Sequence, residues 1–500
     1  MNNALKQTLL ARVYDVAVET PLERAVKLSD SLGTQAYLKR EDLQPVHSFK
    51  LRGAYNKIVQ LTNAERQRGV IAASAGNHAQ GVALAAKKLD ISALIIMPRT
   101  TPGIKIDAVK SYGAEVELAG DSYSDAAHHC KQRVAETGRT YIHPFDDPLV
   151  IAGQGTVGRE ILEQLPSVTH IFVPVGGGGL IAGIAQYVKA LRPEVTVIGV
   201  QSEDANTMQP SLKKGQRVQL SHVGIFADGT AVKQLGEYTF EVIKQLVDDS
   251  VVVTNDQLCA AIKAIFEETR SIVEPSGALA TAGLAAYAAA HNMQDAQAVA
   301  ICSGANMTFE RLQFVAERTL LGSGREALFA VTLPEKPGAL QCFCHNIVNG
   351  HNITQFGYRL RQRGQAYILV GIGMSGTLDK AMFTKKMEQH AYEFRDLSAD
   401  DVAKEHVRYM IGGPAPHAQN EHFYRINFPE RPGALNDFLK IMSGTWNISL
   451  FHYRGQGGDV GDVLVGFETA NTKDLEKALH ASTYDFAPAD MSHSMQLFIR

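Results

Sequence analysis

The last third of the sequence contains the same two motifs twice, at one constant spacing. VTLPEKPGAL begins at Val331 and INFPERPGAL at Ile426, while NITQFGYR begins at Asn352 and NISLFHYR at Asn447. The same offset of 95 residues separates the two members of each pair. Two motifs at one offset indicate a duplicated module, and a copy of roughly 80 to 95 residues has the size of a small domain.

Each copy reads as a small β-α-β-β unit, and the polar segment 412–422 joins the two. Gly338 and Gly433 stand where the first strand turns into the helix, and they let the backbone come close to a ligand. Tyr358 and Tyr453 occupy equivalent places on the second strand. These four residues are candidates for contact with an effector. Half-buried strand tyrosines with no ligand role are the alternative.

The chain before the repeat has a different sequence pattern. Short runs rich in β-branched or aliphatic residues alternate with helical patterns, which is typical of βα units with a parallel sheet. The nearly all-apolar runs fit a sheet covered on both faces, and ligands of such folds bind at the carboxyl ends of the strands. A linker is predicted at 320–327. The predicted strands lie within 69–74, 93–98, 114–120, 170–179, 196–201 and 298–306.

Composition narrows the class of protein. Across 500 residues the hydrophobic share is 45 % and the net charge −3, and no basic run favours binding to nucleic acid or to a membrane. Five scattered cysteines indicate reduced thiols. The N-terminus lacks the pattern of a signal peptide, and the most apolar stretch, 278–290, is too short to cross a bilayer. We expect a soluble cytoplasmic protein.

Four motifs before residue 320 carry residues that suit chemistry. In SFKLRGA, Lys50 is either an ordinary surface lysine or an amine that forms an imine with a carbonyl compound. In SAGNHAQG, directly after a strand, Ser74 and Asn77 either cap a helix or expose N–H groups to a carboxylate or phosphate. In CSGAN, Ser303 is either a turn residue or a partner for a neutral ring nitrogen.

The fourth motif, PVGGGGLIAG, follows a strand with four consecutive glycines, 176–179. Without β-carbons, several N–H groups can converge on one phosphate. The spacing matches neither the dinucleotide fingerprint nor the P-loop. One amine, one anion cradle, one carboxylate-sized turn and one hydroxyl together suit a phosphorylated aldehyde cofactor and an amino acid.

SFKLRGA, SAGNHAQG, GGGGL and CSGAN, in this order, resemble the pyridoxal-phosphate serine/threonine dehydratases of fold-type II. The duplicated tail resembles the paired ACT-like regulatory domains of biosynthetic threonine deaminases. The resemblance implies an α/β catalytic domain of two open, mostly parallel sheets with flanking helices, followed by an α+β ACT-like tandem. The implied bounds are 1–320 for the catalytic domain, with a smaller subdomain at roughly 45–150, and 325–411 and 420–500 for the two ACT-like domains.

The resemblance also implies residue roles. Lys50 holds pyridoxal 5'-phosphate as a Schiff base and removes the α-proton, while Phe49 packs near the ring and Ser303 faces its nitrogen. Asn77 contacts the ring hydroxyl. The phosphate lies against Gly176, Gly177, Gly178 and Gly179, and the substrate carboxylate is received by Ser74, Gly76, Asn77 and His78.

At several positions this sequence differs from related families of the same class, and these differences argue against some activities. Racemases of this class carry a serine where this chain has Ala75, which argues against racemisation. Relatives that need a divalent cation carry acidic ligands where Gln201 and Thr207 stand, so we expect no divalent metal site. Sulfhydrylases and threonine synthases read Lys-Asp-Arg, whereas Leu51 follows the lysine here.

The function implied by the resemblance is conversion of L-threonine to 2-oxobutanoate and ammonia, the first committed step of isoleucine biosynthesis. L-Serine would give pyruvate. Isoleucine is the implied inhibitor and valine a counteracting ligand, and the family suggests a homotetramer. The alternatives are a catabolic serine/threonine dehydratase, which usually lacks the duplicated tail, and an amino-acid sensor with a degenerate catalytic half.

Overall fold

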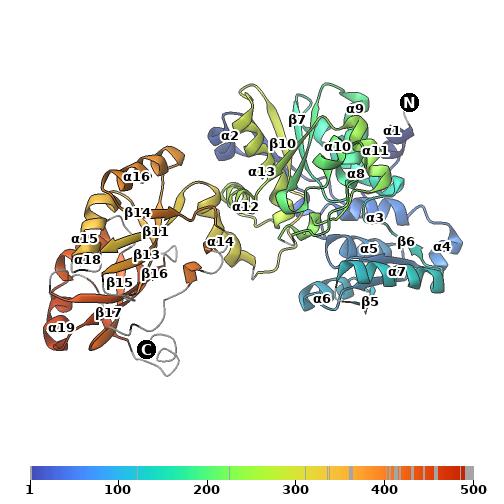
Figure 1. Cartoon of the computed structure of the whole chain (residues 1–500). Coiled ribbons are helices and arrows are strands. Elements are labelled where there is room, and N and C mark those ends of the chain that lie inside the picture. Colours follow the sequence, from blue (N-terminus) through green and yellow to red (C-terminus); the bar gives the residue numbers. More distant parts are fainter. Residues whose placement is uncertain are drawn as a thin grey trace. The chain divides into compact units, whose positions relative to one another are not determined.

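A computed structural model of the chain divides into two compact units, Met1–Thr319 and Leu320–Arg500 (Figure 1). The structure describes residues 3–489 except 121, 225, 310, 335, 337, 360–363, 401–402, 405–406, 410–414, 416–417, 430–432, 443–444, 455–459, 483 and 485.

The first unit contains a six-stranded sheet in the order β1-β2-β10-β7-β8-β9. Every neighbouring pair is parallel except β1 and β2, which run antiparallel at one edge. Its strands are β1 (Leu22–Arg24), β2 (Gln35–Lys39), β7 (His170–Pro174), β8 (Thr196–Ser202), β9 (Asp249–Val253) and β10 (Gln297–Ile301).

A second sheet of this unit has four parallel strands in the order β5-β4-β3-β6. The side chains of β3 and β4 are buried at every position, as expected for strands covered by helices on both faces. The strands are β3 (Val70–Ala73), β4 (Ala93–Met97), β5 (Glu115–Leu118) and β6 (Thr140–Tyr141).

Helices connect these strands, and several begin at caps that the sequence encodes. Thr62, Ser122 and Thr254 each form a reciprocal capping box, which satisfies free N–H groups of the first turn. The helices are α1 (Asn3–Leu9), α2 (Val26–Leu32), α3 (Lys50–Ile58), α4 (Asn63–Arg68), α5 (Asn77–Lys88), α6 (Gly103–Ser111), α7 (Tyr123–Thr137), α8 (Pro148–Gln164), α9 (Gly179–Leu191), α10 (Met208–Lys214), α11 (Glu237–Leu246), α12 (Asn255–Thr269), α13 (Pro275–Ala290) and α14 (Arg311–Gly322).

The predicted parallel α/β architecture of this unit is confirmed. Each of the six predicted strand segments overlaps an observed strand. The predicted strands did not include β2, β9, the two-residue β6 or the antiparallel edge strand β1. No helix within the described residues is long and apolar enough to cross a membrane.

The second unit is built on one eight-stranded antiparallel sheet in the order β14-β11-β13-β12-β16-β17-β15-β18. This order is symmetric about the β12–β16 pair, where the two copies meet to form a continuous sheet. Its strands are β11 (Glu326–Pro334), β12 (Ile353–Arg359), β13 (Gln365–Gly373), β14 (Glu393–Asp396), β15 (Glu421–Pro429), β16 (Asn447–Arg454), β17 (Val460–Glu468) and β18 (Phe486–Pro488).

The helices of this unit are α15 (Ala339–Phe343), continued by a π-helical turn (Cys344–Val348), α16 (Thr377–Gln389), α18 (Ala434–Met442) and α19 (Thr472–Ala481). Each copy thus extends the predicted β-α-β-β unit by one helix and one strand. The predicted linker 320–327 is mostly regular structure, because α14 continues to Gly322 and β11 begins at Glu326. Much of the predicted join, 412–422, lies outside the described residues.

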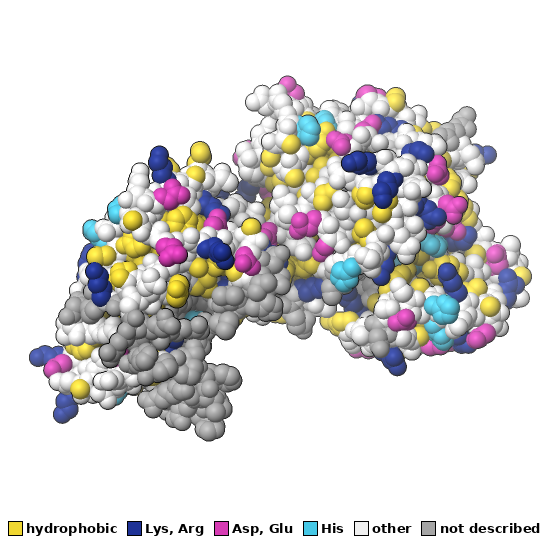
Figure 2. Space-filling view, viewed as in Figure 1, with side chains coloured by type: hydrophobic (Ala, Val, Ile, Leu, Met, Phe, Trp, Pro, Cys, Tyr) yellow, Lys and Arg dark blue, Asp and Glu magenta, His cyan; other side chains and the backbone are white. Residues whose placement is uncertain are grey.

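The surface shows no concentration of one charge on the face in view. Acidic and basic side chains are interspersed over both units (Figure 2). This distribution agrees with the nearly balanced composition of 49 Lys and Arg against 52 Asp and Glu. On that face no basic patch of the kind that binds a polyanion is visible among the described residues.

Candidate active site

Lys50 is the first residue of α3, and its side chain is only partly exposed. Its Nζ donates a hydrogen bond to the main-chain oxygen of Pro144 at 3.0 Å and lies 5.2 Å from the centre of the Phe49 ring. Burial lowers the pKa of this amine to about 8, although the nearby Glu274 carboxyl opposes the shift. A lysine with a depressed pKa is partly neutral near pH 7, so Lys50 can act as a nucleophile and as a base.

The segment with Ser303 pairs with the segment that precedes Lys50. Ser48 and Gly304 form an antiparallel bridge, and the N–H of Phe49 donates to the oxygen of Ser303 at 3.3 Å. Ser303 follows β10 and is buried, with its Oγ donating to the main-chain oxygen of Ser276 at 3.1 Å. The fold thereby brings Lys50 and Ser303, which are far apart in sequence, into one site.

Residues 74 to 76 connect β3 to α5, which begins at Asn77, and all four residues are partly exposed. The N-cap of α5 is Gly76, and no side chain caps the helix there, since Ser74 Oγ accepts only from the N–H of Gly76, at 3.3 Å. Capping by Ser74 or Asn77, the alternative from sequence, is therefore not what the structure shows. First-turn N–H groups of α5 remain for an anion, and they fit the carboxylate site expected here.

The side chain of Asn77 is held from two sides. Its Nδ2 donates to Glu274 Oε1 at 2.6 Å, and its Oδ1 accepts from Asn306 Nδ2, also at 2.6 Å. Burial, with a further contribution from Asp228, raises the pKa of Glu274 to about 7. Asn77 therefore has a fixed orientation at the start of α5.

His78, the next residue along α5, is buried, and its Nε2 lies 2.8 Å from the oxygen of Ile142. Burial lowers the pKa of this imidazole to about 3, so the ring is neutral and donates to that carbonyl. With Nε2 engaged in this way, the main-chain N–H of His78 is its better candidate group for a carboxylate.

The four glycines form the turn between β7 and α9. Gly178 has φ +97°, a left-handed conformation that favours glycine. A β-carbon on Gly177 would lie 2.4 Å from the ring of Phe145, and one on Gly179 would lie 2.9 Å from the Phe145 backbone. The oxygen of Gly177 is fixed by Thr239 Oγ1 at 2.7 Å. The turn is thus closely packed against its neighbours, and its amides suit a phosphate.

The start of α3 rests on a buried network of charges. Arg52, two residues after Lys50, pairs with Glu41 at 2.8 Å and Glu160 at 2.5 Å, and Lys39 pairs with Glu160 at 2.6 Å. All four side chains are fully buried. Two positive and two negative groups balance, which makes their burial tolerable.

Both parts of the chain match known protein families. Residues 13–304 match the family of pyridoxal-phosphate dependent enzymes. Residues 317–407 and 412–499 each match the C-terminal regulatory domain of threonine dehydratase. The biosynthetic L-threonine dehydratase of Burkholderia multivorans is 51% identical over 99% of this chain and 99% of that protein. The chain belongs to the biosynthetic threonine dehydratase family.

Other members of the threonine dehydratase family align over nearly the whole chain. The Escherichia coli enzyme is 46% identical over 96% of this chain and 94% of its own, and the chloroplastic enzyme of Arabidopsis thaliana is 50% identical over 96% and 82%. Among solved structures, processed threonine deaminase isoform 2 of Solanum lycopersicum is 52% identical, with a TM-score of 0.63 over 64% of this chain and 88% of that chain. Maize serine racemase is 33% identical, with a TM-score of 0.59 over 64% and 97%.

Membership of the dehydratase family confirms that the protein is an enzyme that uses pyridoxal phosphate. The residues present fit this cofactor: an amine of lowered pKa at Lys50, a glycine turn with no room for side chains, and a buried hydroxyl at Ser303. The individual roles given to these residues from sequence remain predictions.

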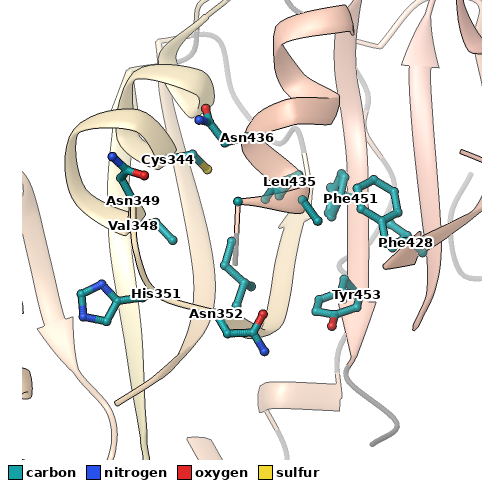
Figure 3. Close-up of a pocket in the computed structure, with 14 residues that line it drawn as sticks. Cys344, Val348, Asn349, His351, Asn352, Phe428, Leu435, Asn436, Phe451 and Tyr453 are labelled. Atoms are coloured by element: carbon teal, nitrogen blue, oxygen red, sulfur yellow. The ribbon is translucent and has the colours of Figure 1, made fainter. Parts of the chain in front are cut away.

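The regulatory unit contains a pocket between its two copies, with an empty volume of ≈ 540 Å³ (Figure 3). Gly433 and Tyr453, two of the predicted effector residues, line it. Figure 3 places Asn352 and Tyr453 at one end and Asn349 and Asn436 at the other. Apolar side chains also line this pocket, namely Val348, Ile353, Phe428, Leu435, Phe451 and Val463.

A second pocket, ≈ 520 Å³, lies at the equivalent place in the symmetric sheet. The other two predicted effector residues, Gly338 and Tyr358, line it. Gly338 and Gly433 have φ +83° and +85°, so both turns adopt a left-handed conformation that favours glycine. The pockets differ at one notable position, where Trp446 lines the second and His351, its equivalent, the first.

Three residues that contact the predicted site residues were not predicted from the sequence: Glu274, Asn306 and Phe145. Glu274 precedes a proline at the start of α13, a setting with no local signal of function. Asn306 belongs to the CSGAN motif, but nothing in the motif shows that its amide reaches Asn77. Phe145 contacts the glycine turn only through the fold.

The positions where some relatives carry metal ligands have another role here. Gln201 Nε2 donates to the oxygen of Val175 at 3.1 Å and to Thr207 Oγ1 at 3.0 Å, and its Oε1 accepts from the N–H of Thr207 at 2.9 Å. Over the described part of the chain, no three His, Cys, Asp or Glu side chains gather in a way that could hold a metal ion. Gln201 thus serves to fix the turn after β8.

Proposed function

We propose that this protein deaminates L-threonine to 2-oxobutanoate and ammonia, the first committed step of isoleucine biosynthesis. The observation that carries this proposal is the half-buried amine of Lys50, with its pKa near 8, in a chain about half identical to biosynthetic threonine dehydratases over its full length. When bound, pyridoxal phosphate supplies an electron sink for the loss of the α-proton.

We propose the following roles for the chain's own residues, which their geometry supports. The glycine turn 176–179 binds the phosphate, and the buried Ser303 hydroxyl faces the ring nitrogen as a neutral partner. First-turn N–H groups of α5 bind the substrate carboxylate, which leaves the α-carbon to be oriented toward Lys50. The Lys50 amine, neutral in part near pH 7, removes the α-proton.

We further propose that isoleucine inhibits the enzyme by binding the pockets of the regulatory unit, and that valine counteracts it. A pocket with apolar walls and polar groups at both ends suits an amino acid with a branched aliphatic side chain. Inhibition from a separate site requires that the enzyme has two global states and that isoleucine makes different contacts in each. We expect a homotetramer to provide these two states. The expected location is the cytoplasm.

A turnover assay tests the whole proposal. Purified protein is supplied with L-threonine, L-serine and their D-forms, and ketoacid formation is measured with and without isoleucine and valine. We expect L-threonine turnover, its suppression by isoleucine and its recovery with valine. D-forms that react as fast as L-forms would contradict the assignment.

The two alternatives lose support. A catabolic dehydratase has no evident use for the tail that matches the threonine dehydratase regulatory domain twice. A degenerate sensor would not be expected to keep the depressed Lys50 pKa beside a glycine turn that excludes side chains. Racemisation is disfavoured because Ala75 carries no group that could move a proton.

A further inference from the structure

The amide of Asn77 is fully oriented by its neighbours. At 2.6 Å, Asn77 Nδ2 donates to Glu274 Oε1, an arrangement that suits the ionised carboxylate because that form only accepts hydrogen bonds. The amide of Asn306, itself donating to the oxygen of Val46 at 2.8 Å, donates to Asn77 Oδ1 on the other side. Asn77 therefore keeps one N–H for a further partner, while its acceptor oxygen is directed toward Asn306.

Glu274 is placed for this contact by main-chain and packing constraints. Its own N–H donates to the oxygen of Gly304 at 3.1 Å. A β-carbon on Gly304 would lie 2.7 Å from Glu274 Oε1 and 3.2 Å from Asn77 Nδ2. The glycine of the CSGAN motif thus leaves the space in which carboxylate and amide meet.

Charged groups on other segments of the same unit act on Glu274. Lys50 influences it from α3, and Asp228 and Lys105, which pair with each other at 2.9 Å, influence it from two other segments. Burial and Asp228 bring the pKa of Glu274 to about 7. The charge of Glu274 therefore changes within the pH range in which most enzymes work.

We propose that Glu274 is a positioning residue of the cofactor site: together with Asn306 it fixes Asn77 so that only an N–H is offered to the ring oxygen of pyridoxal phosphate. The site then binds that oxygen as an acceptor, in its deprotonated form. This inference rests on the proposed cofactor site at Lys50. No step in the reaction is assigned to Glu274 itself.

The test compares three variants of the full-length protein. Glu274→Ala removes the acceptor, Glu274→Gln keeps an acceptor oxygen without the charge, and Glu268→Ala is the matched control. Glu268 is a partly buried carboxylate of the same unit, and its Oε1 accepts from the N–H of Leu28 at 2.7 Å with no link to Asn77. Pyridoxal phosphate is titrated into apo-protein, and the cofactor absorbance is followed as a function of pH.

Losing a hydrogen bond to a charged group should weaken cofactor binding in Glu274→Ala by about tenfold. The pH midpoint of the cofactor absorbance should move by about one unit in the same variant. Glu274→Gln should bind the cofactor within about threefold of wild type, because Asn77 can still donate to it. Glu268→Ala should match wild type in both readouts, whatever its effect on stability.

Wild-type affinity and an unmoved pH midpoint in Glu274→Ala would overturn the inference. If that variant fails to fold, Asn306→Ala decides, because it removes the other restraint on Asn77 and should shift both readouts in the same direction. A wild-type protein that takes up no pyridoxal phosphate would instead refute the proposed function, so the two failures are distinguishable.

Discussion

Arg52 forms an ion pair with Glu160 at 2.5 Å, and neither side chain is exposed to solvent. The contact joins α3, which begins at Lys50, to the C-terminal part of α8. Thr156, one turn earlier on α8, accepts a further hydrogen bond from Arg52 at 3.1 Å. The start of α3, and with it Lys50, is held in place by charges that the reaction does not use.

Removing one partner of this buried pair should be strongly destabilising. Glu160→Ala leaves Arg52 and Lys39 with a single carboxylate, so we expect the stability of the first unit to fall by about 3 to 5 kcal/mol. Glu163→Ala is the control on the same helix, because Glu163 pairs with Arg159 at 2.8 Å but is half exposed. Its expected loss is below about 1 kcal/mol. Equal unfolding midpoints for the two variants in urea would contradict this account.

The packing of the glycine turn predicts a specific loss of cofactor affinity. In Gly177→Ala the new methyl would lie 2.4 Å from the Phe145 ring, so the turn must shift. Displaced amides should bind the phosphate less well, and we expect the cofactor dissociation constant to rise about tenfold or more. Gly103→Ala, where no atom lies within 4 Å of the added carbon, should leave that constant unchanged. An unaffected Gly177→Ala protein would show that the turn does not hold the phosphate.

The lowered pKa of Lys50 predicts how fast apo-protein takes up the cofactor at different pH values. Only the neutral amine reacts with an aldehyde, and the neutral form gains population as the pH approaches about 8 from below. The loading rate should rise about tenfold per pH unit below pH 7 and level off above pH 8. Stopped-flow absorbance measures this rate. A rate that keeps rising to pH 10 would indicate an ordinary solvent-exposed lysine.

The two tyrosines that line the regulatory pockets should contribute to inhibition. Removing only the hydroxyl, in Tyr358→Phe and Tyr453→Phe, should raise the isoleucine concentration for half-inhibition about five- to tenfold by loss of one hydrogen bond. Uninhibited turnover should stay near wild type. Tyr367→Phe, on the exposed side of β13, is the control. Full inhibition of both single variants and of the double variant would refute this role.

Trp446 permits one pocket to be observed separately. It is the only tryptophan of the chain, and it lines the pocket with Gly338 and Tyr358. Isoleucine entering that pocket should change the tryptophan fluorescence, and Tyr358→Phe should shift the midpoint of the change more than Tyr453→Phe does. An isoleucine-inhibited enzyme whose fluorescence does not respond would show that this pocket is not used.

Much of this fold could be predicted because its signals are local. The apolar runs at β3, β4, β7, β8 and β10 are short and are followed by glycine, serine or proline, and each is a strand in the structure. The 95-residue repeat predicted two equivalent modules, and the symmetric strand order about β12 and β16 shows them. The motifs around Lys50, Asn77, the glycine turn and Ser303 were found for the same reason.

The remainder depends on contacts between distant segments. Nothing local to Glu274 shows that it meets Asn77, 197 positions earlier. The network of Arg52 with Glu41 and Glu160 likewise joins three elements. The pocket lined by Asn352 and Tyr453 forms only when two copies share one sheet. The sequence motifs were sufficient to find the candidate reactive residues. The residues that contact them and shift their pKa values could be found only in the folded structure.

Covalent attachment of the cofactor to Lys50 is the central claim, and trapping tests it most directly. Holoenzyme is treated with borohydride, which reduces an imine to a stable amine, and the digested protein is examined by mass spectrometry. We expect the pyridoxyl group on the peptide that contains Lys50, and a Lys50→Ala protein without it. The group on a different lysine, or on none after loading with pyridoxal phosphate, would contradict the account.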